Sequence, residues 1–97
     1  MASSEGIKNK LKGCKSRIRK EFGVRTVGLF GSYARGTQQK TSDVDILVEF
    51  VKPVGLFRFL ELEALLSSIL GAKVDLVTKK ALKPAIGKHI LKEVVYL

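Results

Sequence analysis

Two short apolar segments, Val24–Phe30 and Val44–Phe50, enclose a polar stretch that begins with Gly31-Ser32 and ends with Asp43-Val44-Asp45. Each segment is rich in β-branched residues and bounded by turn formers, so each is predicted to be a largely buried strand. Ten residues separate the Gly-Ser pair from the first acid. A chain with this pattern carries a turn with free backbone amides after one strand and two carboxylates at the start of the next.

The rest of the sequence alternates helical and extended patterns. Apolar residues that recur every three or four positions predict helices at 7–22, at 55–70 and from Pro84 onward. A single helical turn is predicted at 32–36. A third strand is predicted at 73–78, and an apolar tail at 94–97 ends the chain. This order predicts an α/β (α+β) fold, a small mixed three-stranded sheet with helices packed on one face. The first two strands are expected to be antiparallel, and a right-handed crossover makes the second and third parallel.

Length and composition predict one soluble domain spanning residues 1–97. The chain is 45% hydrophobic and 28% charged, and it has no apolar run of the length that a membrane span needs. Residues 1–12 lack the apolar core of a secretory signal, so a cytoplasmic protein is expected. With one cysteine, Cys14, and one histidine, the chain offers neither a disulfide nor a zinc ligand set. Any metal would therefore be bound by oxygen.

The charge balance favours anionic partners without choosing among them. Eighteen Lys and Arg against nine Asp and Glu give a net charge of +9. Such an excess attracts nucleic acid, nucleotides or an acidic protein at long range. Direct nucleic-acid binding is not favoured, because the sequence shows no aromatic signature of an RNA-binding module.

Gly31 and Ser32 fit a phosphate-binding turn. A glycine followed by serine at the start of a helical turn offers exposed N–H groups and a hydroxyl, and a side chain at Gly31 would block a close approach. The alternative is an ordinary strand-ending turn in which Ser32 caps the helical turn. The spacing to the acids favours the phosphate interpretation.

Asp43 and Asp45 fit a magnesium site. Side chains alternate along a strand, so these two carboxylates share a face with Leu47. Mg²⁺ prefers oxygen ligands, and two ions about 3.5–4 Å apart can hold the attacking and leaving oxygens of a nucleotidyl transfer. The alternative is a solvated strand edge. It is less favoured because Asp45 lies in a run expected to be half-buried, where an unpaired carboxylate is costly.

Three further residues extend this candidate site. Asp75 lies within the third strand and would complete a three-acid cluster as a metal ligand or as a base; the alternative is an edge acid paired with a lysine. Arg35 is one turn from Ser32 and either reaches a phosphate or is solvated. Ser42 either contacts the nucleotide or forms hydrogen bonds near Asp43.

The segment GSYARGTQQKTSDVDILVEF from Gly31, together with VDLVT at 74–78, resembles the nucleotidyltransferase superfamily. More narrowly, it is similar to the minimal nucleotidyltransferases of bacteria and archaea, the MntA-like antitoxins encoded beside HEPN-domain proteins. The resemblance implies that Gly31 and Ser32 hold the triphosphate of ATP and that Asp43 and Asp45 bind Mg²⁺. It implies that Asp75 is the third carboxylate.

The resemblance also implies an activity and a partner. The chain is expected to transfer AMP from ATP to a tyrosine of a cognate HEPN ribonuclease toxin, with which it would form a hetero-oligomer, and so to neutralise that toxin. Two alternatives stay open. One is an antitoxin that acts by complex formation without catalysis, and the other is a nucleotidyltransferase acting on RNA or a small molecule.

Overall fold

The computed structural model describes residues 3–82 and 84–97. Its elements follow the predicted order: α1 (Ser4–Phe22), β1 (Val24–Phe30), α2 (Ser32–Arg35), β2 (Val44–Phe50), α3 (Leu56–Leu70), β3 (Val74–Thr78), the 3-10 turn η1 (Lys79–Ala81), α4 (Pro84–Glu93) and β4 (Val95–Tyr96). Helix α1 begins three residues before the predicted Ile7. The Ser3 side chain accepts a hydrogen bond from the Gly6 amide and caps the helix there, a signal outside the apolar stripe.

Within the described residues the sheet has four strands in the order β3-β2-β1-β4, so the predicted count of three is wrong. The predicted antiparallel β1–β2 pair and parallel β2–β3 pair are both confirmed. The fourth strand is the apolar tail, in which Val95 and Tyr96 pair antiparallel with β1. Leu97 extends this pairing by donating its amide to the Val27 carbonyl at 3.0 Å. A two-residue strand is too short for any alternating pattern to predict it.

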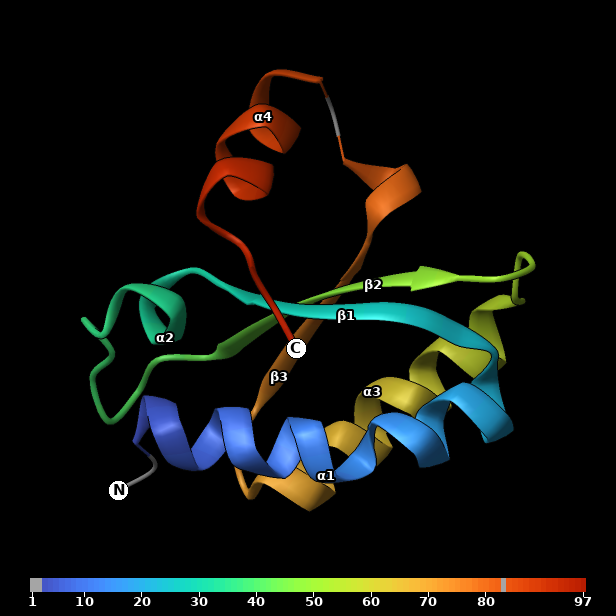
Figure 1. Cartoon of the computed structure of the whole chain (residues 1–97), viewed down its shortest axis with the longest axis horizontal. Coiled ribbons are helices and arrows are strands. Elements are labelled where there is room, and N and C mark those ends of the chain that lie inside the picture. The colour runs from blue at the N-terminus through green and yellow to red at the C-terminus, as the bar shows by residue number, and fades with distance from the viewer. Residues whose placement is uncertain (1–2, 83) are drawn as a thin grey trace.

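Helices cover both faces of the sheet (Figure 1). Helices α1 and α3 lie on one face, as predicted, whereas α4 lies on the other, so the expectation that all helices share one face is wrong. The tail after α4 reaches the sheet because Gly28 has no side chain. A Cβ at Gly28 would lie 2.5 Å from Cγ2 of Val94.

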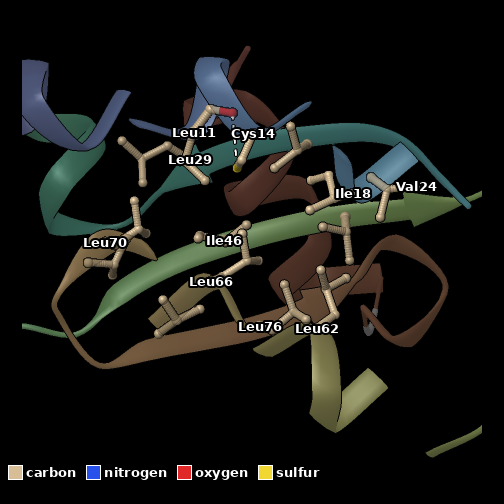
Figure 2. Packing of buried hydrophobic residues seen from close by; sticks show 14 of the residues in the cluster. Leu11, Cys14, Ile18, Val24, Leu29, Ile46, Leu62, Leu66, Leu70 and Leu76 are labelled. Atoms are coloured by element: carbon tan, nitrogen blue, oxygen red, sulfur yellow. Dashed lines mark hydrogen bonds between the residues drawn. The ribbon is translucent and has the colours of Figure 1, made fainter. Parts of the chain in front are cut away.

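The hydrophobic core lies between the sheet and the α1–α3 layer (Figure 2). Every apolar position predicted for α1 is buried: Ile7, Leu11, Cys14, Ile18 and Phe22. The Cys14 thiol donates to the Leu11 carbonyl at 3.3 Å, and burial raises the pKa of this thiol above its ordinary value. In the described part of the chain, no helix has the length and apolar character needed to cross a membrane.

Not every aromatic residue around the start of α3 lies in the core. Phe50 and Phe59 pack against it. Phe57, however, is 81% exposed in the first turn of α3. Its neighbour Leu56 is also exposed, so the start of α3 carries an apolar surface that the helical stripe does not bury.

Side chains of α3 fix the position of the edge strand β3. The Ser67 hydroxyl accepts a hydrogen bond from the Val74 amide at 3.2 Å, and the Glu63 carboxylate accepts one from the Leu76 amide at 3.0 Å. These bonds satisfy edge donors that would otherwise be free to pair with another strand. They also hold the residue between them, Asp75, in place beside β2.

Candidate active site

The sheet brings the three predicted acids to one face. Asp45 of β2 and Asp75 of β3 are direct partners in the parallel pair, and side chains at the same level of neighbouring strands point to the same side. Asp43 lies two residues before Asp45 and shares that side. The intervening Val44 is fully buried in the α1–α3 core, so the acids lie on the opposite face. Asp75 is exposed, whereas Asp43 and Asp45 are half-buried.

Asp45 is the electrostatic centre of this face. Burial, and after it the negative charges of Asp75 and Asp43, raise the pKa of its carboxyl from the ordinary 3.8 to about 6. The guanidinium of Arg35 acts in the opposite sense but does not offset them. The face therefore carries more negative charge than its own residues neutralise.

Gly31 forms the corner that meets Asp45. Its backbone has φ +71° and ψ −152°, a combination that only glycine adopts readily. Phe30, the last residue of β1, pairs with Asp45, so the chain turns directly against that carboxylate. A Cβ at Gly31 would overlap Oδ2 of Asp45 and lie 3.0 Å from its Cγ. The sequence predicts that Gly31 allows phosphate to approach; the structure adds that the Asp45 side chain itself requires glycine here.

Ser32 opens the short helix α2 but does not cap it. The N-cap is Gly31, whose carbonyl accepts hydrogen bonds from the Ala34 and Arg35 amides, each at 3.1 Å. The alternative role of Ser32 as an N-cap is therefore wrong. Ser32 is half-buried directly after the Gly31 corner, where its predicted contact with phosphate stays a prediction.

Arg35 is held by a residue that sequence analysis missed. The Glu93 carboxylate, at the end of α4, accepts hydrogen bonds from Arg35 Nη1 at 3.2 and 3.0 Å and from the Gly31 amide at 3.2 Å. Arg35 is solvent-exposed, as its alternative role predicts, but it is also ion-paired, and its contact with phosphate stays a prediction. A signal for Glu93 did exist, because it is the single acidic residue in the sequence after Asp75.

Ser42 lies beside Asp43 in the loop before β2. Its hydroxyl accepts a hydrogen bond from the Gln39 amide at 2.9 Å, and its own amide donates to the Gln39 carbonyl at 3.0 Å. This turn sets the entry of the chain into β2, in line with the alternative in which Ser42 forms hydrogen bonds near Asp43. Ser42 and Asp43 line a hollow of about 730 Å³ together with Lys40 and Lys73.

The donor set on this face fits Mg²⁺. As they stand in residues 3–82 and 84–97, no three His, Cys, Asp or Glu side chains are already arranged around a single metal position. Mg²⁺ does not need such a cage, since it is commonly held by one or two carboxylates together with waters and substrate phosphates. Asp43 and Asp45 supply two carboxylates on one face, and a cation bound there would offset the repulsion from Asp75 and Asp43 that contributes to the raised pKa of Asp45.

A second hollow, of about 660 Å³, lies away from these acids. It surrounds the far end of β2 and the start of α3, and its lining includes Val51, Leu56, Phe59, Lys79 and Lys80. None of the predicted site residues lines it. Its apolar lining is more extensive than that of the hollow beside Asp43, but the groups suited to phosphate chemistry lie with Asp45.

The raised pKa of Asp45 predicts an unusual dependence of stability on pH. Between pH 4 and 6 the folded protein holds this proton more tightly than the unfolded chain, so the free energy of unfolding falls as pH rises and levels off above about 6. We expect Asp45→Asn to remove this fall. After allowance for solvent screening, the variant should be more stable than the parent by about 1–2 kcal/mol at pH 7.5, with little difference at pH 4.

Urea unfolding of both proteins from pH 4 to 8, in the presence of EDTA, measures this difference. Titrating groups common to both proteins cancel in the subtraction. A difference that is the same at pH 4 and pH 7.5 would contradict the assigned environment of Asp45.

Comparison with known proteins places these features in a family. The sequence model of the nucleotidyltransferase domain matches residues 11–97. The chain is 48% identical over 97 residues to the protein adenylyltransferase MntA of Thermococcus cleftensis, covering 100% of this chain and 98% of that protein.

Two solved structures share the fold. One, described as a minimal nucleotidyltransferase, superposes with a TM-score of 0.86 at 30% identity, covering 99% of this chain and 97% of that one. The other, a toxin-antitoxin with AMP-PNP, has a TM-score of 0.76 at 28% identity, covering 91% of this chain and 69% of that one. The matching sequence model and the Thermococcus relative agree with the acids on neighbouring strands and the glycine corner packed against Asp45. The chain therefore belongs to the nucleotidyltransferase domain family.

Proposed function

We propose that this protein is a Mg²⁺-dependent protein adenylyltransferase that transfers AMP from ATP to a tyrosine of a cognate HEPN-domain toxin and so neutralises it. The observation that carries the proposal is the register of β2 and β3, which sets Asp45 beside Asp75 on the face that meets the Gly31 corner. The name of the Thermococcus relative, protein adenylyltransferase, supports the reaction class. The solved toxin-antitoxin with AMP-PNP supports an ATP-like ligand and a toxin partner.

The proposed reaction is a single displacement at phosphorus. The tyrosine oxygen attacks the α-phosphorus of ATP, a new P–O bond forms, and the bond to the bridging oxygen of the β-phosphate breaks. Pyrophosphate leaves, and the phenol proton passes to a carboxylate. Asp75 is the candidate base, because it is the exposed member of the three acids and lies directly across from Asp45.

The remaining residues would bind and orient ATP. Asp43 and Asp45 would hold Mg²⁺, whose charge would offset the negative charge of the triphosphate at this face. Gly31 and Ser32 would donate to phosphate oxygens from the corner after β1, and Arg35 would reach the same group from the end of α2. Ser42 would lie close to the nucleotide through its place beside Asp43. The proposal implies a cytoplasmic protein, because ATP and the RNA cut by such a toxin are found there.

Mass spectrometry of the partner tests this function. The purified protein is incubated with ATP, Mg²⁺ and the HEPN protein encoded beside it, and the intact partner is weighed. We expect the partner to gain mass in steps of one AMP, and peptide mapping should place the AMP on tyrosine. Omission of Mg²⁺ or addition of EDTA should abolish the gain.

The two alternative functions give different results in the same assay. An antitoxin that acts only by complex formation would co-purify with the partner and protect cells without any gain in mass. A nucleotidyltransferase acting on RNA would leave the partner unmodified and label RNA, with binding that weakens steeply as salt rises. Either result with an active, pure partner would contradict the proposed function.

A further inference from the structure

Glu93 occupies donors that ATP would need. Its carboxylate binds the Gly31 amide at 3.2 Å and Arg35 Nη1 at 3.0 Å. These two groups are among those that the proposed function assigns to the triphosphate. We propose that Glu93 is a built-in competitor of nucleotide phosphate: in the absence of ATP it binds the Gly31 amide and Arg35, and ATP must displace it. This inference rests on the proposed function.

The chemistry of the contact matches that of a phosphate. Carboxylate and phosphate oxygens both accept charge-assisted hydrogen bonds from arginine and from backbone amides. Glu93 uses both of its oxygens on Arg35 and shares one of them with Gly31. It lies 62 residues after Gly31 in the chain, so this is a tertiary contact made by the last turn of α4 and not a local turn of the backbone.

Other carboxylates surround Glu93, so its position is electrostatically unfavourable apart from the contacts with Arg35 and Gly31. Glu93 lies close enough to Asp45 that its negative charge contributes to the raised pKa of Asp45, as Asp75 and Asp43 do. A fourth carboxylate beside three others is repelled by them, and Arg35 and the Gly31 amide are what hold it there. Mg²⁺ and the triphosphate would change that balance, because the phosphates supply several oxygens to the same donors.

The contact is accessible to a ligand. The Arg35 side chain is 53% exposed and that of Glu93 is 31% exposed, so a phosphate can reach the pair without opening the core. Exposed ion pairs of this kind are individually weak, which makes displacement feasible. Since Glu93 is the last residue of α4, its release would also free that end of the helix from the Gly31 corner.

Calorimetric titration with ATP and Mg²⁺ tests the inference. We expect Glu93→Gln, which keeps the shape but removes the charge, to bind ATP about 2- to 5-fold more tightly than the parent, the upper part of the range that loss of one exposed ion pair gives. Glu61→Gln is the matched control. Glu61 also accepts from an arginine, Arg58, at 2.9 Å, but on α3, and its loss should change the affinity less than about twofold.

A second variant separates the contact from the general effect of charge. Glu93→Asp keeps the negative charge but is shorter by one methylene group, so it should lose the Gly31 and Arg35 bonds. We expect its affinity for ATP to lie between those of the parent and Glu93→Gln. This variant also carries the test if Glu93→Gln does not fold.

The outcomes distinguish the two proposals. Tighter ATP binding by Glu93→Gln and by Glu93→Asp supports the competitor. If the parent binds ATP and both variants bind equally or more weakly, Glu93 positions Arg35 and does not compete, and the competitor is overturned while the proposed function stands. If Glu93→Asp matches the parent and only Glu93→Gln binds more tightly, the direct contact is overturned in favour of general charge repulsion. If neither the parent nor any variant binds ATP, the proposed function fails as well.

Discussion

Replacement of both Asp43 and Asp45 by alanine is expected to reduce AMP transfer to the partner by more than about a hundredfold, because even the outer partners of metal ligands are commonly worth 10- to 100-fold. Both residues lie on the face where the sheet gathers its acids, and their removal leaves Asp75 as the one carboxylate of the three. The rate is measured by intact-mass analysis of the partner over time. Stability should not fall, since the loss of Asp45 relieves the cost of a half-buried charge.

The control for this variant is Glu49→Gln. Glu49 lies on β2 beyond Leu47, on the same strand as Asp45 but away from the Gly31 corner, where it pairs with Thr26 of β1. Its replacement should leave transfer within about twofold of the parent, as surface changes usually do. In cells that carry the toxin, the double variant should still bind the partner but no longer protect. Full protection by the double variant would show that binding alone neutralises the toxin.

Gly31→Ala is expected to cost about 3 kcal/mol of folding free energy and to abolish nearly all transfer. The backbone at Gly31 lies in a region that strains any other residue by about 1–3 kcal/mol. The added methyl group would also overlap the Asp45 carboxylate, which must then move away from its place beside Asp75. Urea unfolding and the mass assay measure the two losses separately.

Gly23→Ala is the matched control for this substitution. Gly23 follows α1 and has the same φ of +71°, but a Cβ there meets nothing within 4 Å. It should lose about 1 kcal/mol from backbone strain alone and keep its activity. Equal losses of activity in the two variants would mean that the overlap between a methyl group at position 31 and the Asp45 carboxylate does not affect the reaction.

Much of the fold could be predicted because local patterns agree with it. The stripe from Ile7 to Phe22 has the helical period, and the two β-branched segments are bounded by turn residues, so their type and order followed from sequence. The shared face of Asp43 and Asp45 followed from the period of a strand. That Asp75 lies directly beside Asp45 required the strand register, which hydrogen bonds from Ser67 and Glu63 to β3 help to fix.

What could not be predicted depends on contacts between distant parts of the chain. The strand β4 has two residues and exists because β1 offers it a partner and Gly28 leaves room for Val94. Glu93 stands out in the sequence as the single acidic residue after Asp75, but nothing local relates it to Arg35, 58 residues earlier. The exposure of Phe57 likewise depends on distant parts of the chain, because no other element covers that end of α3 in the described structure.

Modification of the buried Cys14 thiol would report when α1 separates from the sheet. The sulfur sits on α1 against the sheet, 6% exposed, and its raised pKa keeps it in the unreactive thiol form. An alkylating reagent can therefore modify it only when the α1 layer separates from the strands. Because the chain has no second cysteine, the extent of modification would follow the opening of that layer alone, even in mixtures with other proteins.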